Sequence, residues 1–187
     1  MDMIIKKRFE EHLEVANAVM ASGILEQVDR IGGVIKKALA NGNKVLFCGN
    51  GGSAADSQHL AAEFVGRFQK ERGGLPAIAL TVDTSILTAV GNDYGFDRVF
   101  SRQVEALGKS GDVLIGISTS GNSANVLAAV ELAKKMGIYC VGMTAYGGGK
   151  MAAVCDECIA VPAKVTARAQ EMHILIGHIL CELVDGE

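Results

Sequence analysis

Apolar residues recur at helical spacing over the first forty positions of the chain. Two stripes of this kind follow one another, and each places its members on one face of a helix. Gly42 comes just after the second stripe and favours the end of a helix there. We therefore predict two N-terminal helices within residues 1–40. The stripes consist of Ile5, Phe9, Leu13, Ala16 and Met20, and of Ile24, Val28, Ile31, Ile35 and Leu39.

After this point, short apolar runs alternate with helical patterns, which is typical of βαβ units around a mostly parallel sheet. A final helix is predicted over 166–185, and the sheet with its covering helices over 44–161. The predicted strands are 44–48, 77–81, 113–117, 138–143 and a short one at 158–161; the predicted helices between them are 54–68, segments within 84–107, and 124–136.

The strands read as continuous apolar runs, which indicates helices on both faces of the sheet. With 187 residues, of which 49% are hydrophobic, we expect a single α/β domain, 1–187, with three layers and five strands. The terminal helices carry broader apolar faces than such a sheet needs for cover. Part of that surface is therefore expected to be buried in a homo-oligomer.

Two segments rich in glycine and hydroxyl groups each lie between a predicted strand and a predicted helix. The first is Gly49–Ser53 and the second is Ser118–Ser123. Unpaired N–H groups and the positive end of the helix dipole favour an anion at such a junction. We predict two anion-binding loops, suited to phosphate, at the carboxyl ends of two strands.

Charge and cysteine content narrow the range of partners. The formal net charge is −3, and no run of Lys and Arg is long enough to follow a nucleic-acid backbone. No apolar run approaches the length of about 20 residues that spans a membrane, and the first residues do not resemble a secretion signal. Five cysteines, an odd number, fit a reduced compartment, so we expect a cytoplasmic protein without nucleic-acid or membrane partners.

Two further motifs are explained without special chemistry. Cys155 and Cys158 have a spacing known from zinc and redox sites, but no second pair follows, so packing is the preferred interpretation. Gly49, Gly51 and Ala54 match a dinucleotide-binding pattern poorly, because the acidic residue Asp83 comes too late.

Polar residues suggest a second kind of site. His59 and Glu63 are one helical turn apart and could share a metal ion, although a solvated helix face explains the same spacing. Gln170 and His178 lie on the last helix about 12 Å apart along its axis. Either an ion lies between them, or one of them serves the substrate, or a second subunit contributes. His173 is expected to be a core histidine with a backbone partner.

Four separated motifs together resemble the sugar isomerase (SIS) domain family, and the similarity covers nearly the whole chain. The motifs are 48–56, 90–93, 117–123 and 170–173. The resemblance implies a flavodoxin-like sheet and a homotetramer with active sites at subunit interfaces. It also implies conversion of sedoheptulose 7-phosphate to D-glycero-D-manno-heptose 7-phosphate, the first step toward heptose precursors of bacterial lipopolysaccharide or capsule.

The resemblance also implies roles for individual positions. Glu63 and His178 match the proposed base and acid, and one Zn ion per subunit is implied at His59, Glu63, Gln170 and His178. The implied substrate-binding positions are Asn50, Gly51, Gly52, Ser53, Glu63, Asn92, Asp93, Ser118, Thr119, Ser120, Ser123 and Gln170.

This chemistry agrees with the residues themselves. An aldose and a ketose interconvert when a base removes the proton beside the carbonyl and an enediol forms, which Glu63 can do while His178 moves a hydroxyl proton. Asp56 could orient His59 or bind a sugar hydroxyl. Some family members carry an acid just before Gln170, where this chain has Thr166, Ala167 and Arg168.

Two alternatives remain. One is a non-catalytic paralogue of the same fold that binds the replication initiator, which lacks the Glu and the final His. The other is a sugar-phosphate sensor or an enzyme of amino sugars, which usually carries an additional domain.

Overall fold

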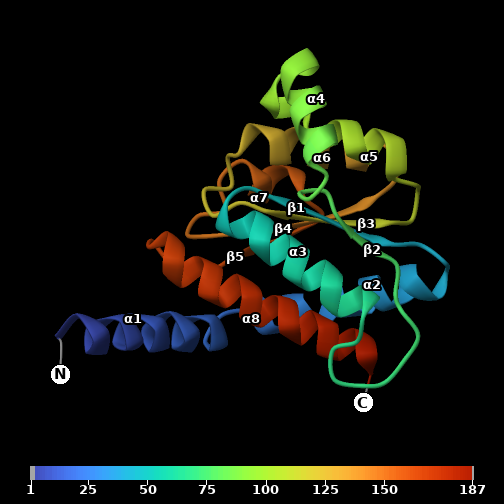
Figure 1. The fold of residues 1–187 in the computed structure, drawn as a ribbon. Coiled ribbons are helices and arrows are strands. Elements are labelled where there is room, and N and C mark those ends of the chain that lie inside the picture. The colour runs from blue at the N-terminus through green and yellow to red at the C-terminus, as the bar shows by residue number, and fades with distance from the viewer. Residues whose placement is uncertain (1–2, 187) are drawn as a thin grey trace.

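The computed structural model describes residues 3–186. It opens with α1, Met3–Met20, and α2, Ile24–Ala40. The apolar stripe of α2 packs into the core, with Ile31 and Ile35 fully buried. The stripe of α1 does not, because Val19 is the one buried residue among those described in this helix. Both predicted helices are confirmed, and much of α1 extends away from the rest of the molecule (Figure 1).

The sheet has five strands within residues 3–186, and its strand order is β2-β1-β3-β4-β5. Every pairing between these strands is parallel, so the sheet is fully rather than mostly parallel, and the order is that of flavodoxin-like folds. The strands are β1 Val45–Gly49, β2 Ala77–Ala79, β3 Val113–Ile117, β4 Tyr139–Thr144 and β5 Glu157–Ala160.

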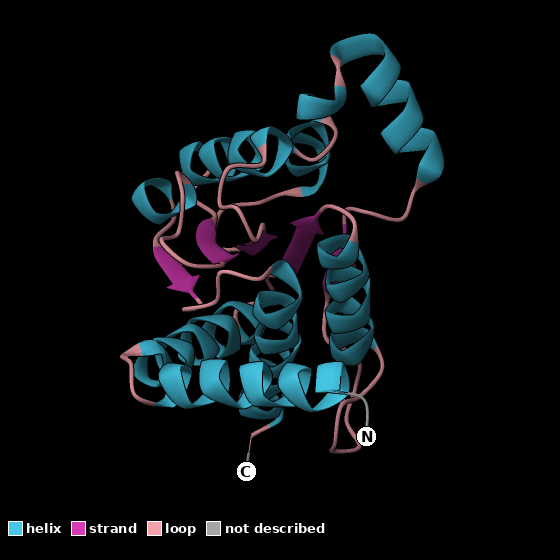
Figure 2. Ribbon diagram, turned by 90° about the vertical axis from the view of Figure 1, so that its left-hand side faces the viewer, coloured by secondary structure: helices cyan, strands magenta, loops and turns pink. Residues whose placement is uncertain are grey.

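Helices cover both faces of the sheet, as the continuous apolar strands predict (Figures 1 and 2). Val45 and Phe47 of β1 pack in one core with α2, α3 and α8, whereas Leu46 and Cys48 pack in a second core with α5 and α6. The alternation follows from the two-residue period of a strand. The helices are α3 Gly52–Val65, α4 Thr84–Tyr94, α5 Ser101–Leu107, α6 Ala124–Lys135, α7 Met151–Val154 and α8 Thr166–Asp185, with a 3-10 turn at Phe96–Arg98.

The largest differences from the prediction are in two elements with other bounds and in one helix that the pattern did not show. Helix α3 ends at Val65 rather than near Phe68, because Gly66 follows with a non-helical backbone. Strand β2 is shorter than predicted, and the single-turn helix α7 was not predicted at all, since four residues are too few to show a period.

The strand order explains where a ligand can bind. From β1 the chain crosses to β2 on one side, and from β3 it crosses to β4 on the other, so the order reverses between β1 and β3. A crevice forms outside the carboxyl ends of the strands at such a switch point. The two anion-binding loops predicted from the sequence are the loops that leave β1 and β3.

Candidate active site

The first loop joins β1 to α3 and brings the backbone close to α8. Gly51 adopts φ 58° and ψ −122°, a conformation that favours glycine. A Cβ on Gly52 would lie 2.6 Å from Nε2 of Gln170, so a side chain there would displace the Gln170 amide. Ser53 is buried at the first turn of α3. The loop therefore presents backbone groups, with Gln170 packed against them.

The second loop joins β3 to α6 and gathers hydroxyl groups. Ser118 is buried, and its Oγ lies 2.8 Å from Oγ of Ser123 and 3.3 Å from Oγ of Ser120. Thr119 and Ser120 line a pocket of about 340 Å³ together with Tyr146, Lys164 and Thr166. Neutral donors, a helix N-terminus and one cation on the pocket wall suit a phosphate group.

A pair of amides connects the two loops. Nδ2 of Asn50 donates to Oδ1 of Asn125 at 2.9 Å, and Nδ2 of Asn125 donates back to Oδ1 of Asn50 at the same distance. Asn125 is buried on the first turn of α6. Asn125 could not be found from the sequence, because nothing in the chain marks a partner 75 residues away from Asn50.

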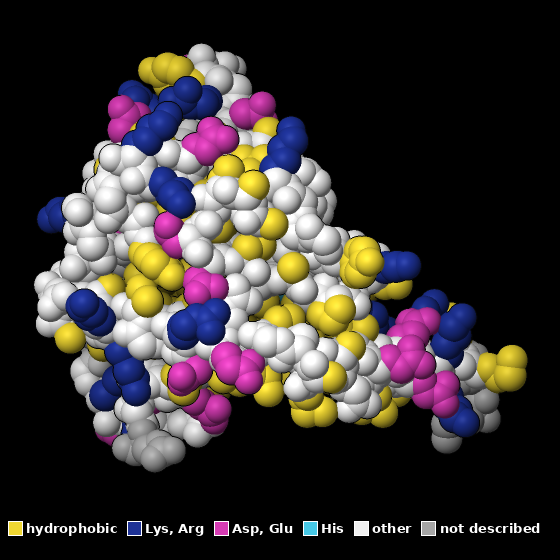
Figure 3. Space-filling view, turned by 180° about the vertical axis from the view of Figure 1, so that it is seen from behind, with side chains coloured by type: hydrophobic (Ala, Val, Ile, Leu, Met, Phe, Trp, Pro, Cys, Tyr) yellow, Lys and Arg dark blue, Asp and Glu magenta, His cyan; other side chains and the backbone are white. Residues whose placement is uncertain are grey.

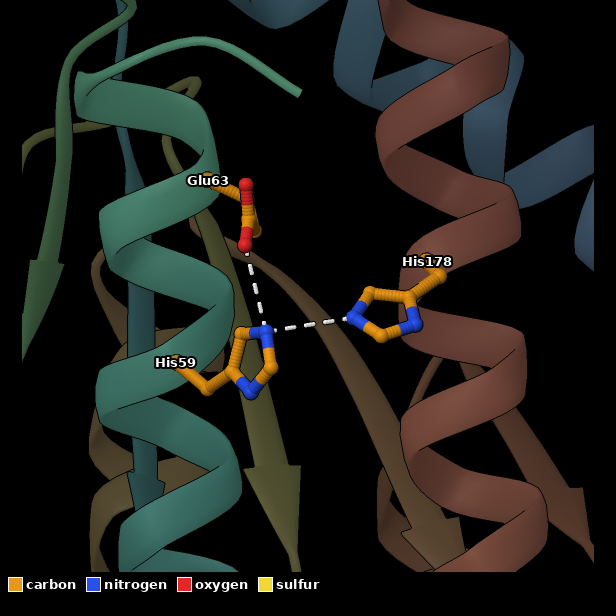
Figure 4. Close-up of side chains that lie close together, drawn as sticks. All are labelled: His59, Glu63 and His178. Carbon is orange, nitrogen blue, oxygen red and sulfur yellow. Dashed lines mark hydrogen bonds and ion pairs between the residues drawn. The ribbon is translucent and has the colours of Figure 1, made fainter. Parts of the chain in front are cut away.

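Three side chains converge where α3 and α8 lie side by side (Figure 4). Nε2 of His59 lies 3.1 Å from Oε1 of Glu63 and 3.2 Å from Nε2 of His178. His59 is exposed, and Glu63 and His178 are partly buried. The two helices thus bring together residues that are 119 positions apart in the sequence.

This trio, His59, Glu63 and His178, forms a potential metal site. One ligand atom from each residue lies within 4.8 Å of the others. Two imidazole nitrogens and one carboxylate oxygen are a donor set that Zn²⁺ accepts, and three protein ligands leave a position open for a substrate oxygen. The donor set therefore fits the zinc ion that the resemblance implies.

Gln170, the fourth implied ligand, lies at Gly52, seven residues before His59 on α3. Seven residues of helix correspond to about 10 Å. In this subunit the trio is therefore assembled from three of the four implied ligands, and Gln170 lies nearer to the loop after β1. Its role as a ligand stays a prediction.

Asn92 and Asp93 lie on another part of the molecule. They are on α4, which projects from the body on the side of the sheet opposite α8 (Figures 1 and 2). Both are exposed, and Nδ2 of Asn92 donates to Oδ1 of Asp93 at 2.8 Å. Their predicted substrate contacts therefore require either a movement of α4 or a second subunit.

Two residues near the trio add to what the sequence indicated. Phe68 stacks on the imidazole of His178, with ring centroids 5.2 Å apart and an interplanar angle of 22°. Oδ2 of Asp56 is buried without a hydrogen-bond partner in the described part of the chain, and this burial raises the pKa of the carboxyl group. Asp56 interacts electrostatically with His59, and both of its predicted roles, orienting His59 or contacting the substrate, stay predictions.

The remaining candidates are structural, as predicted. His173 is fully buried, its Nε2 lies 2.9 Å from the carbonyl oxygen of Thr144, and burial lowers the pKa of its imidazole. The five cysteines within residues 3–186 are free thiols. Burial raises the pKa of Cys155 to about 12, so its thiol is protonated at neutral pH.

Comparison with known proteins agrees with this arrangement. The family model described as "SIS domain" matches residues 9–145, which include both loops, His59 and Glu63. The chain belongs to the SIS domain family. Among the described residues of this SIS domain, no helix is long and apolar enough to cross a membrane.

Curated relatives that are 50–64% identical to this chain are named phosphoheptose isomerases. The SIS domain is 53% identical to "Phosphoheptose isomerase" of Aneurinibacillus thermoaerophilus, over 99% of this chain and 94% of that protein. It is 55% identical to "Phosphoheptose isomerase 1" of Campylobacter jejuni, over 97% of each. The solved phosphoheptose isomerase of Neisseria gonorrhoeae superposes with a TM-score of 0.92 at 46% identity, covering 98% of this chain and 97% of that one.

Proposed function

We propose that this protein is an aldose-ketose isomerase that converts sedoheptulose 7-phosphate to D-glycero-D-manno-heptose 7-phosphate through an enediol. One observation carries the proposal: Glu63 and His178 meet beside His59 in a chain that aligns over nearly its whole length with phosphoheptose isomerases. The product would supply heptose for bacterial surface polysaccharides.

The side chains divide the reaction between them. Glu63 takes the proton from the carbon beside the carbonyl, and His178 moves a hydroxyl proton. A Zn²⁺ held by His59, Glu63 and His178, with Gln170 as a further candidate, would polarise substrate oxygens when bound. Asn50, Gly51, Gly52 and Ser53 would hold the sugar hydroxyls. Asn92 and Asp93 would join them through a movement of α4 or from a second subunit.

The phosphate is assigned to the second loop. Oγ of Ser118 lies within hydrogen-bond distance of Oγ of Ser120 and Ser123, and Thr119 and Ser120 line the pocket that also contains Lys164, so these hydroxyl groups would donate to an anion bound there. Binding there fixes the far end of the sugar, which holds C1 and C2 in one position against Glu63.

Ser120→Ala is expected to raise KM for the sugar phosphate between about tenfold and 150-fold with little change in kcat, because a hydrogen bond to a charged group contributes about 1.5–3 kcal/mol. Steady-state kinetics measure this. Ser85→Ala on α4 is a suitable control, since Ser85 is exposed and lies outside the loop. An unchanged KM would place the phosphate elsewhere.

We also propose a homotetramer. Phe9, Leu13 and Met20 on α1 are 69%, 59% and 61% exposed, and an apolar groove of about 440 Å³ lies between α1, α2 and α8. Figure 3 shows hydrophobic side chains along the lower edge of the molecule, where α1 extends. A second copy of the chain would cover this surface.

The free thiols support a reducing compartment such as the cytoplasm.

Leu13→Glu is expected to break this assembly, because it places a charge in an apolar contact. Light scattering should show tetramers for the unaltered protein and smaller species for the variant. Glu14→Gln, one position away, serves as control. A monomeric unaltered protein would refute the proposal.

The proposed function is tested with pure protein and sedoheptulose 7-phosphate in D₂O, with added zinc or with a chelator. We expect aldose formation with deuterium at C2, lost in chelator and restored by zinc. Turnover that survives complete metal removal would refute the zinc assignment alone. A folded protein that is inactive in every arm would favour the initiator-binding alternative, which the named relatives do not support.

A further inference from the structure

The segment of residues 66–75, between α3 and β2, connects the ends of the two helices that carry the trio. It leaves α3 after Val65, passes the C-terminal end of α8 and returns to the sheet (Figure 1). We call it the latch segment. It contains no helix or strand, so its conformation depends on side-chain contacts.

Arg72 holds the latch segment to the end of α3. Its Nη2 donates to the carbonyl oxygen of Glu63 at 3.1 Å, and its Nη1 donates to that of Phe64 at 2.9 Å. The last carbonyl groups of a helix have no partner within the helix. The guanidinium group therefore satisfies the backbone of Glu63 itself.

Asp185 holds the same guanidinium group from α8. Nε of Arg72 lies 2.6 Å from Oδ1 of Asp185, and the two side chains are only 16% and 2% exposed. Oδ2 of Asp185 accepts hydrogen bonds from the backbone N–H groups of Gln69 at 3.1 Å and Lys70 at 3.3 Å. One carboxylate thus fixes both Arg72 and the backbone of the latch segment.

Without Arg72, a charged carboxylate at the position of Asp185 would be electrostatically unfavourable. A carboxylate in the last turn of a helix faces the negative end of the helix dipole. Burial by itself would raise the pKa of Asp185, but the hydrogen bonds from Arg72, Gln69 and Lys70 outweigh this and lower it. The carboxylate is therefore charged and paired at neutral pH.

The latch segment also touches the trio. Phe68, its third residue, stacks on the imidazole ring of His178. The latch segment therefore contacts both proposed catalytic residues. Arg72 hydrogen-bonds the backbone of Glu63, and the ring of Phe68 stacks on the imidazole of His178.

We propose that Arg72 and Asp185 are positioning residues, which fix Glu63 and His178 relative to each other by locking the latch segment between α3 and α8. Neither residue touches the substrate. The kinetic part of this inference rests on the proposed function, whereas the geometric part does not.

Asp185→Asn, which keeps the shape of the side chain, is expected to lower kcat about tenfold to 100-fold, because small displacements of catalytic groups have effects of this size. KM for sedoheptulose 7-phosphate should change less than twofold, since the Ser118–Ser123 loop is attached to other elements. Arg72→Ala should behave alike, and added guanidinium ion should restore part of its kcat.

The chain offers a matched control for stability. Lys44 and Asp112 form a second ion pair, at 2.6 Å, with side chains 17% and 1% exposed. This pair lies just before β1 and β3, and within residues 3–186 neither side chain hydrogen-bonds to Arg72, Asp185 or the trio. Lys44→Met should lower the melting temperature about as much as Asp185→Asn does, but should leave kcat unchanged. Equal losses of kcat in Lys44→Met and Asp185→Asn would overturn the proposal, as would an Arg72→Ala enzyme that guanidinium does not rescue.

A crystal structure of the Asp185→Asn variant separates this inference from the proposed function. We expect the distance from Nε2 of His59 to Nε2 of His178 to exceed the 3.2 Å found here, with Phe68 displaced from the imidazole. An unchanged trio would refute the positioning role of Arg72 and Asp185 even if the protein converts the sugar phosphate. Conversely, a displaced trio in a protein without activity on sedoheptulose 7-phosphate would support the positioning role and refute the proposed isomerase function.

Discussion

Glu63→Gln is expected to lower kcat by about 10²–10⁴, because the amide cannot accept the proton that general-base catalysis requires. The side chain keeps its size, and the hydroxyl groups of the Ser118–Ser123 loop are untouched, so KM should stay close to its normal value. Deuterium exchange at C2 should disappear together with product. Steady-state kinetics and NMR in D₂O measure both effects.

Glu105→Gln is the matched control for this prediction. Glu105 is an exposed residue on α5 that pairs with Arg102, so the same change there should leave activity intact. Full turnover by the Glu63→Gln variant would show that another group removes the proton. Loss of binding with retained chemistry would assign Glu63 to substrate recognition instead.

Gly177→Ala is expected to impair both stability and activity, because α8 packs tightly against α3 at this residue. An added Cβ would lie 2.5 Å from Cδ2 and 2.6 Å from Cδ1 of Leu60, which is itself buried. Relieving this overlap should cost about 1–3 kcal/mol in the free energy of unfolding, measured in urea. Since Gly177 precedes His178 and Leu60 follows His59, kcat should fall at least tenfold.

Gly33→Ala is the control for Gly177→Ala. It shows the effect of replacing a helical glycine by alanine where the added Cβ overlaps with no other atom. Gly33 lies within α2, is exposed, and has no atom within 4 Å of an added Cβ. Alanine is the better helix former, so this variant should be about 0.5–1 kcal/mol more stable. If Gly177→Ala behaves in the same way as Gly33→Ala, the close contact between α3 and α8 does not limit the site.

Much of the fold follows from local pattern. Val113–Ile117 shows a buried parallel strand because its apolar run is continuous, and the Gly and Ser residues after it mark the loop that ends it. Helix α7 could not be found in this way, since a single turn has no period to detect. The end of α3 was placed too late because Phe68 continues the apolar pattern, although its ring packs on His178 instead.

The site was predictable only where spacing along one helix defines it. His59 and Glu63 are one turn apart, so their meeting follows from the sequence. His178 was already a polar candidate on the last helix, and the resemblance grouped it with them. Contacts between distant segments, such as Asn50 with Asn125 or Arg72 with Asp185, depend on how elements pack. The sequence marks Asn92 and Asp93 by resemblance alone, and their position on the projecting helix α4 could not be read from it.

The distance in sequence between His59 and His178 has a consequence for how the molecule is made. The two rings come from helices separated by 119 residues, with four of the five strands formed in the interval. Contacts of such long range form slowly, because a large loop must close before they contribute. During synthesis the trio cannot form until α8 has left the ribosome, and all five strands described here are made before that helix, so the sheet can pair before the proposed catalytic residues meet.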